Sequence, residues 1–98
     1  MSGSEDEPGQ QRYDIVLAHS ARRALQEELP EAVAMAAWET IDGPLRERPR
    51  VIGHPLRAPY AGMWRATRGE YRIRYKIDDR RRTVTIFDVD HRRDAYHR

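Results

Sequence analysis

The chain lacks cysteine, has one lysine, and contains no long apolar run. Without cysteine it cannot form disulfides, bind a metal through thiolates or use a thiolate nucleophile. No apolar stretch approaches the roughly 20 residues that span a bilayer, and residues 1–11 have neither the basic nor the apolar part of a secretory signal. We therefore expect a cytoplasmic protein that does not associate with membranes.

Known catalytic motifs are also missing. The sequence contains no HExxH, Walker loop, GxGxxG or GxSxG. Its four histidines are scattered without the spacing of metal ligands, and the basic half has few carboxylates to hold a divalent cation. Asp88 and Asp90 are expected to pair with nearby arginines. We therefore expect neither a metal nor a cofactor.

The charge of the chain is unevenly distributed. Residues 1–43 hold three arginines against nine acidic residues, a net charge of −6. Residues 44–98 hold fourteen arginines and Lys76 against seven acidic residues, a net charge of +8. Arginine binds phosphates bidentately and stacks on bases, so the second half favours a nucleic-acid partner. A GC-rich coding sequence would also favour arginine over lysine, but it would not confine the positive charge to one half.

The sequence pattern predicts an acidic, disordered tail over residues 1–11 and a single domain over residues 12–98. The domain begins with the apolar run Tyr13–Ala18, which is typical of a β-strand. Ser20 is a suitable N-cap for a helix that ends at Leu29.

A second helix is expected to start at Pro30 and to be interrupted by Gly43-Pro44, so that the two helices form an antiparallel hairpin. The apolar face of the second helix carries Val33, Ala36, Ala37 and Ile41. Pro49–Gly62, rich in proline and glycine, is predicted to be a loop. A meander of three strands follows: Met63–Arg68, Tyr71–Asp78 and Thr83–Asp90. The predicted α+β fold is therefore β-α-α-β-β-β, a small antiparallel sheet with a two-helix hairpin on one face.

The strand Tyr71–Asp78 alternates between apolar and basic residues. Its apolar residues share one face, and its cations share the other: Arg72, Arg74 and Lys76. A short turn at Gly69 gives a register in which Trp64 and Ala66 face the core while Arg65 joins the three cations. Like charges on neighbouring strands repel each other, so a face with four cations favours an anionic ligand over a merely solvated surface.

Metal-free cleavage of RNA is the chemistry that fits these residues. Arginines stabilise the charge of a pentacovalent phosphorane, and a general acid protonates the leaving 5′-oxygen. The nucleophile is the 2′-hydroxyl of the RNA, so the protein needs no nucleophilic side chain.

Four motifs occur in order along the chain: Gly53-His54-Pro55-Leu56-Arg57, Gly62-Met63-Trp64-Arg65, Gly69-Glu70-Tyr71-Arg72-Ile73-Arg74-Tyr75 and Asp90-His91-Arg92-Arg93-Asp94-Ala95-Tyr96. Over about residues 12–97 the sequence resembles the RelE/ParE toxin superfamily, and most closely RelE-type toxins of bacterial type II toxin–antitoxin systems. The resemblance implies a microbial RNase-like sheet with two helices against it. It also implies an endoribonuclease that cleaves mRNA in the ribosomal A site by 2′-hydroxyl attack and so inhibits translation.

The resemblance further implies roles for single residues. Arg72 matches a phosphate-binding arginine, and Arg65 matches a basic residue of the preceding strand. Arg92 matches an arginine that stabilises the transition state or protonates the leaving group, and Tyr96 matches a tyrosine that stacks on a base. Further candidates for binding RNA phosphates are Arg57, Arg74, Lys76 and Arg93.

One position departs from the family pattern. Met63 stands where some members carry a second lysine, so the lysine pair proposed to activate the 2′-hydroxyl is incomplete. Arg65 stays protonated and is a poor base. The general base stays open, with His91 and His54 as candidates because imidazole titrates near pH ~6.5. The departure also leaves open a ParE-like DNA gyrase inhibitor without nuclease activity. A small RNA- or protein-binding module with a decayed site is a further alternative.

The resemblance implies a cognate RelB-like antitoxin, and an acidic segment of it would lie over the basic half in a toxin–antitoxin hetero-oligomer. The other expected partners are the ribosome and mRNA. Direct DNA binding is not expected.

Overall fold

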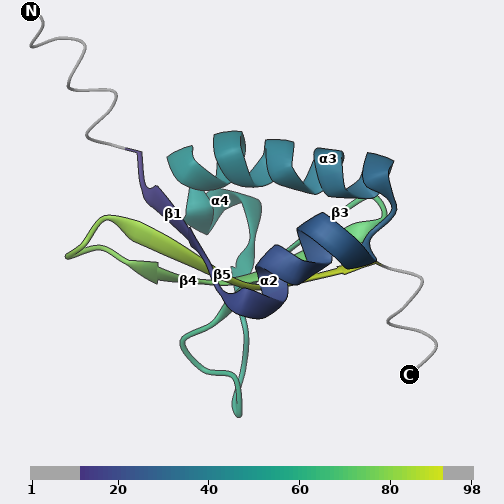
Figure 1. Ribbon diagram of the computed structural model, residues 1–98. Helices are drawn as coiled ribbons and strands as arrows, with labels where there is room; N and C mark the ends of the chain where they lie inside the picture. The colour runs from purple at the N-terminus through teal and green to yellow at the C-terminus, as the bar shows by residue number, and fades with distance from the viewer. Residues whose placement is uncertain (1–11, 92–98) are drawn as a thin grey trace, which may run out of the picture.

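The computed structural model describes residues 12–91, which form a five-stranded sheet with helices packed along one face (Figure 1). The strands lie in the order β1-β5-β4-β3-β2. They are β1 (Asp14–Leu17), β2 (His54–Pro55), β3 (Trp64–Arg68), β4 (Tyr71–Asp78) and β5 (Thr83–His91). The helices are α2 (His19–Arg23), its π-helical continuation η1 (Ala24–Glu28), α3 (Glu31–Thr40), its π-helical continuation η2 (Ile41–Leu45) and α4 (Pro49–Ile52). The predicted α+β class, with a helical hairpin on one sheet face, is confirmed.

One edge of the sheet differs from the predicted antiparallel arrangement. β1 pairs in parallel with β5, with Asp14 opposite Thr83 and Leu17 opposite Ile86. The other neighbouring strands are antiparallel. A parallel pair needs a long crossover connection, and here the helical hairpin and three strands lie between β1 and β5 along the chain.

The start of α2 also differs from the prediction. Ala18, in an extended conformation, is the N-cap, and the Ser20 hydroxyl instead donates to the carbonyl of Phe87 at 2.5 Å. Since β1 pairs with β5 only as far as Ile86, this bond fixes α2 beside the part of β5 that β1 leaves uncovered. Tertiary contact with β5 thus replaces local capping.

The second helix begins after Pro30 and passes through Gly43-Pro44 without ending. Pro44 lies inside η2, where the wider π-helical turn accommodates a residue without an N–H donor. Of the apolar face predicted for this helix, Ala36 is exposed, while the buried members are Val33, Ala37 and Ile41.

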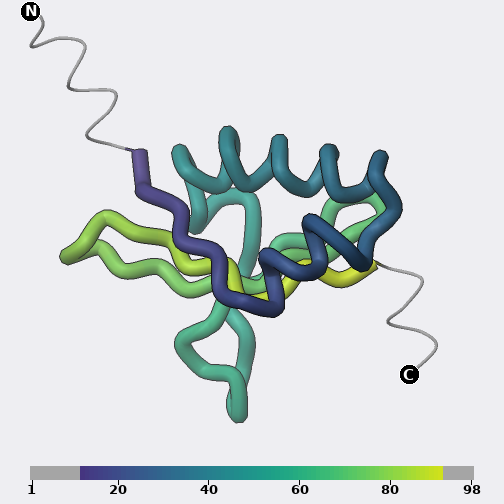
Figure 2. The backbone as a smooth tube through the Cα atoms, viewed as in Figure 1, coloured from purple at the N-terminus to yellow at the C-terminus, as the bar shows by residue number. Residues whose placement is uncertain are grey.

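The predicted loop Pro49–Gly62 contains two short elements, α4 and β2. They have four and two residues, too few for a periodic pattern to reveal. Gly53 connects them at a point of close approach, because a Cβ there would lie 2.1 Å from the Tyr75 hydroxyl and 2.8 Å from the Arg65 carbonyl oxygen. The chain between β2 and β3 extends away from the sheet on the side opposite α3 (Figure 2).

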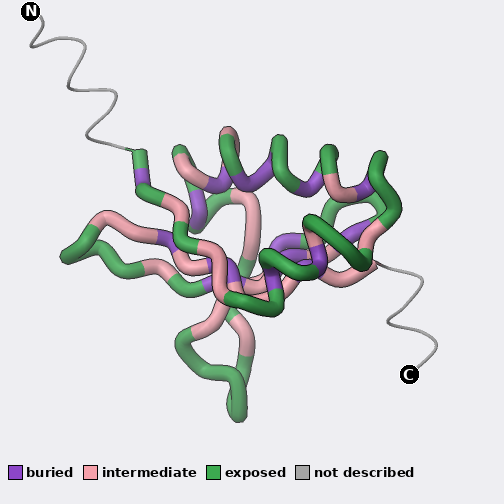
Figure 3. Tube along the Cα trace, viewed as in Figure 1, coloured by how far each residue is buried: buried purple, intermediate pink, exposed green. Residues whose placement is uncertain are grey.

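The core lies between α3 with its continuation η2 and the upper face of the sheet (Figure 3). Its largest fully buried side chains are Tyr75, Ile41, Leu45, Ile73, Ile86 and Val84. The Tyr75 hydroxyl donates to the carbonyl of Pro49 at 2.5 Å, and burial raises the pKa of Tyr75 to about 12. Trp64 stacks beside it with ring centres 6.5 Å apart. These contacts hold β3 and β4, and therefore the opposite face of the sheet, in a fixed arrangement.

Candidate functional site

Arginines from β3 and β4 occupy the sheet face opposite the core. Arg65 pairs directly with Arg74, and Ala66 pairs with Ile73 on the core side. This confirms the register expected from the turn at Gly69, which has a φ of +55°. Side chains opposite each other in an antiparallel ladder share a face.

A β-bulge in β5 brings two carboxylates onto the arginine face. Phe87 is the extra residue, because the pairing passes from Ile86 to Asp88 between adjacent residues of β4. A bulge reverses the alternation of the residues that follow it. Val89 consequently faces the core, as Ile86 does, and Asp88 and Asp90 face the arginines.

A pocket of about 510 Å³ opens on this face, and we call it the arginine pocket. Its floor is formed by Arg65, Arg72, Arg74, Asp88 and Asp90. One wall, from α2 and η1, carries His19, Ser20, Arg23 and Glu28. The other wall, from the chain between β2 and β3, carries Leu56 and Tyr60.

The arginines of the pocket differ in their partners. Arg74 forms an ion pair with Asp88, and its guanidinium lies 5.8 Å from the centre of the Tyr60 ring. Within residues 12–91, Arg65 and Arg72 form no ion pair, and the buried Nε atoms of all three arginines lack a hydrogen-bond acceptor. A buried donor without an acceptor costs about 1–3 kcal/mol. An anion with several oxygen acceptors would offset that cost.

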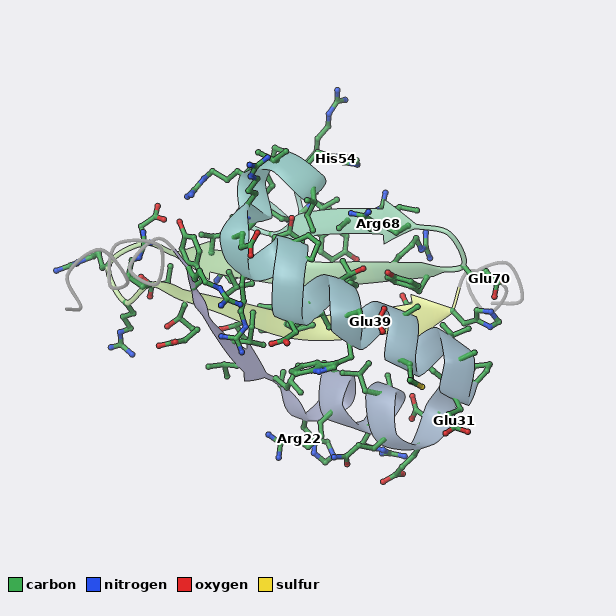
Figure 4. The ribbon with its side chains drawn as sticks, turned by 90° about the horizontal axis from the view of Figure 1, so that it is seen from above. Arg22, Glu31, Glu39, His54, Arg68 and Glu70 are labelled. Atoms are coloured by element: carbon green, nitrogen blue, oxygen red, sulfur yellow. The ribbon has the colours of Figure 1, made fainter. Side chains whose placement is uncertain are left out.

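The histidines predicted as candidate bases do not line the arginine pocket. His54 pairs with Arg65 and so shares the arginine face, but it is exposed at the β2 edge (Figure 4). His91 pairs with Tyr71, which places it on the helix side of the sheet, where its Nε2 lies 3.5 Å from Glu70 Oε1. The bulge in β5 decides this placement.

Other predicted site residues lie around or beyond the pocket. Lys76 is exposed further along β4, opposite Thr85, and Arg57 is exposed between β2 and β3. The predicted residues Arg92, Arg93 and Tyr96, like the acidic tail over residues 1–11, lie outside the described residues.

Sequence reasoning missed His19 and Tyr60 as pocket residues. His19 reaches the pocket through the contact of α2 with β5, which no local motif marks. Tyr60 could have been found from the sequence, since it is an aromatic residue among the prolines and glycines of the predicted loop. In the structure it is 52% exposed. Exposed aromatic rings beside arginines are typical of surfaces that bind single-stranded nucleic acid.

Two kinds of feature are absent from the part of the chain that the structure describes. None of its helices has the length and apolar character needed to cross a membrane. It also holds no cluster of three or more histidine, aspartate or glutamate side chains able to bind a metal ion.

Comparison with known proteins relates the whole folded region to bacterial toxins. Residues 11–96 match the family of the ParE toxin of type II toxin–antitoxin systems, parDE. Toxin RelG of Mycobacterium tuberculosis is 43% identical over 86 residues, which cover 88% of this chain and 98% of that protein. Toxin RelE of the same organism is 39% identical over 93 residues, covering 95% and 91%.

Solved structures agree with the sequence comparison. A chain of the toxin–antitoxin complex RelBE2 from Mycobacterium tuberculosis is 42% identical, with a TM-score of 0.79 over 83% of this chain and 99% of that chain. The isolated E. coli RelE toxin, at 20% identity, shares the fold with a TM-score of 0.66 over 81% and 83%. The chain therefore belongs to the family of ParE toxins of type II toxin–antitoxin systems and is a toxin similar to RelG and RelE.

Proposed function

We propose that this toxin is a metal-independent endoribonuclease that cleaves mRNA in the ribosomal A site and so inhibits translation. The observation that carries the proposal is the arginine pocket, where four arginines line the walls and floor and two of them, Arg65 and Arg72, form no ion pair within residues 12–91. Such a pocket favours a phosphodiester, which offers several oxygen acceptors and negative charge.

Cleavage proceeds by attack of a ribose 2′-oxygen on the neighbouring phosphorus. The bond from phosphorus to the 5′-oxygen breaks, which leaves a 2′,3′-cyclic phosphate and a free 5′-hydroxyl. The step needs a proton acceptor at the 2′-hydroxyl, a proton donor at the 5′-oxygen and positive charge around the phosphorane. Arg65 and Arg72 supply that charge.

The resemblance to RelE-type toxins assigns the remaining contacts. Arg92 stabilises the transition state or protonates the leaving group, and Tyr96 stacks on a base. Their segment follows directly after β5, which lines the pocket through Asp88 and Asp90. Additional phosphate contacts come from Arg57, Arg74, Lys76 and Arg93.

Proton acceptance is assigned to His19, because this histidine lines the arginine pocket. A neutral histidine side chain has one ring nitrogen that can accept a proton. His54 shares the sheet face but stands outside the pocket. For His91, first predicted as a catalytic residue, we propose a positioning role, since its contact with Glu70 orients the end of β5 ahead of Arg92.

The partners follow from the same proposal. RelBE2 of Mycobacterium tuberculosis is a toxin–antitoxin complex, and we propose that this chain binds a RelB-like antitoxin through an acidic segment laid over the arginine pocket. The ribosome and mRNA are its targets, which places the toxin in the cytoplasm. Charge-based docking of this kind weakens as salt rises.

The deciding experiment is cleavage of a defined mRNA on programmed ribosomes, mapped by primer extension, with Arg72→Ala as the control. A cut in the A-site codon that requires ribosomes and is lost in the variant supports the proposal. Folded, toxic protein that makes no such cut would reject it.

A gyrase inhibitor is the second candidate, because the matching family is named for ParE and Met63 occupies the place of a lysine. Inhibition of DNA supercoiling by purified gyrase, without mRNA cleavage, would establish this alternative. Ribosome-dependent cleavage without an effect on supercoiling would exclude it.

A further inference from the structure

A second group of arginines surrounds the turn between β4 and β5. It consists of Arg48, Arg50, Arg80, Arg81 and Arg82, and we call it the turn surface. Figure 1 shows this turn projecting from the body of the molecule. Since Arg80 follows Arg74 by six residues and a strand rises about 3.3 Å per residue, the turn lies roughly 20 Å from the arginine pocket.

The turn is held in place by a network around Asp79. Arg50 donates to the two carboxylate oxygens of Asp79 at 3.2 and 2.8 Å, and the Tyr13 hydroxyl donates to one of them at 2.7 Å. These bonds, with that from Arg50 the largest cause, hold the pKa of Asp79 below its usual range. The Arg81 backbone N–H donates to Asp78 at 3.1 Å. The acidic side chains of the turn are therefore engaged in shaping it.

Arg50 is paired with Asp79, but three other cations of the turn surface are left with little compensation. Arg48, Arg80 and Arg81 are exposed, and within residues 12–91 they form no ion pair. Arg82 has a φ of +52°, which is uncommon outside glycine and costs of order 1 kcal/mol or more. Three exposed arginines close together on a fixed turn repel one another and favour a polyanionic partner.

The hollow between these arginines shows which polyanion fits. It measures about 340 Å³ and is lined by Tyr13, Arg48, Arg50, Val51 and Arg82, with Glu47 as its carboxylate. Tyr13 is 7% exposed and lies under Arg82, whose guanidinium is 4.6 Å from the ring centre. The surface thus offers cations but no free aromatic face. Single-stranded RNA binding relies on such faces, whereas duplex RNA is bound through its phosphates and shape.

We propose that the turn surface binds the phosphate backbone of double-helical RNA. This inference rests on the proposed function in one respect, namely that the target of the toxin is RNA. It assigns two tasks to two surfaces. The turn surface holds a structured RNA, and the arginine pocket, with the exposed ring of Tyr60, takes a single strand.

The test measures binding of the full chain to an RNA duplex of about 16 base pairs, the span of one double-stranded RNA-binding domain. The riboses are 2′-O-methylated, so no 2′-hydroxyl is available for cleavage. The double variant Arg80→Gln/Arg81→Gln is expected to weaken binding about tenfold at ~0.1 M salt. It should also lower the slope of log K against log salt by about 2, since each phosphate contact contributes about 0.9. Arg48→Gln should weaken binding independently.

A matched control removes the same charge elsewhere. Arg22 and Arg68 are exposed on α2 and at the end of β3 (Figure 4), and within residues 12–91 they form no ion pair. The variant Arg22→Gln/Arg68→Gln should retain affinity within about twofold. The proposal would be overturned if both double variants lost the same affinity for the duplex, or if neither lost any.

Failure of this inference is distinguishable from failure of the proposed function. Arg72→Ala is expected to lose mRNA cleavage on ribosomes while retaining most duplex binding. If the turn surface binds duplex RNA but the protein never cleaves mRNA, only the proposed nuclease activity is rejected. If the protein cleaves mRNA but the turn surface contributes nothing to duplex binding, only the role of the turn surface is rejected.

Discussion

Arg74 donates a hydrogen bond to Asp88 across the β4–β5 ladder. Arg72 shares its sheet face but forms no ion pair within residues 12–91. We therefore expect the two arginines to differ in the arginine pocket. Asp88 orients Arg74, which shapes the pocket and adds a phosphate contact, whereas Arg72 is available to bind the ligand directly.

Replacing Arg72 with alanine should separate activity from stability. We expect the rate of mRNA cleavage to fall about 10²- to 10³-fold, because a donor to the developing charge is lost. The free energy of unfolding should not fall, since no ion pair is broken and a buried donor without an acceptor is removed. Single-turnover cleavage on ribosomes and urea unfolding measure the two effects. A large loss of stability with unchanged cleavage would contradict this role.

Replacing Asp88 with alanine, in contrast, should lower the stability of the protein. Arg74 loses its partner on a half-buried sheet face, so we expect the free energy of unfolding to fall by about 1 kcal/mol. Asp88→Asn retains an oxygen acceptor and should lose less. Urea unfolding of both variants checks this order, and equal stability of Asp88→Ala and the wild type would refute the structural role of the pair.

Replacing His19 with asparagine tests the assigned proton acceptor. We expect the cleavage rate to fall about 10²-fold, because the group that accepts the proton of the 2′-hydroxyl is lost. His91→Asn is the comparison and should keep most of the rate. If His91→Asn loses the rate and His19→Asn keeps it, the assignments of the two histidines are reversed.

Replacing Gly53 with alanine should damage the fold. The added Cβ would meet the Tyr75 hydroxyl at 2.1 Å and the Arg65 carbonyl at 2.8 Å, so β3 or β4 must shift. We expect a loss of about 2–3 kcal/mol, typical of overpacking in a filled core. Gly43→Ala is the control, since nothing lies within 4 Å of its Cβ position. Thermal unfolding compares the two variants. Similar melting temperatures would show that the chain around Gly53 moves away from Tyr75 and Arg65 without a loss of stability.

Alkaline pH should destabilise the protein through Tyr75. Its pKa is raised to about 12 by burial, whereas an unfolded tyrosine titrates near pH ~10. The folded chain therefore holds the proton more tightly. This contribution to stability is complete below pH ~10 and is lost as pH rises toward 12. Urea unfolding at pH 9 and 11 should show a smaller drop in Tyr75→Phe than in the wild type, and an identical drop would contradict the shift.

Sequence patterning predicted the part of the site that depends on near neighbours. The alternation of β4 placed Arg72 and Arg74 on one face, and the short turn at Gly69 set the register that adds Arg65. Both follow from strand geometry within a single hairpin. The helical hairpin was also predictable from local signals. Its N-cap at Ala18 was not, because the Ser20 hydroxyl bonds to Phe87 of β5 instead of capping the helix.

The amino-acid sequence by itself determined the charged face, the hairpin register and the family to which the toxin belongs. Tertiary structure decided the parallel pairing of β1 with β5, the place of His19 in the arginine pocket, and the position of His91 on the opposite face. These features depend on residues distant in the chain and on one bulge at Phe87. Periodicity records only which way neighbouring side chains point, whereas packing between distant segments selects the partners they meet.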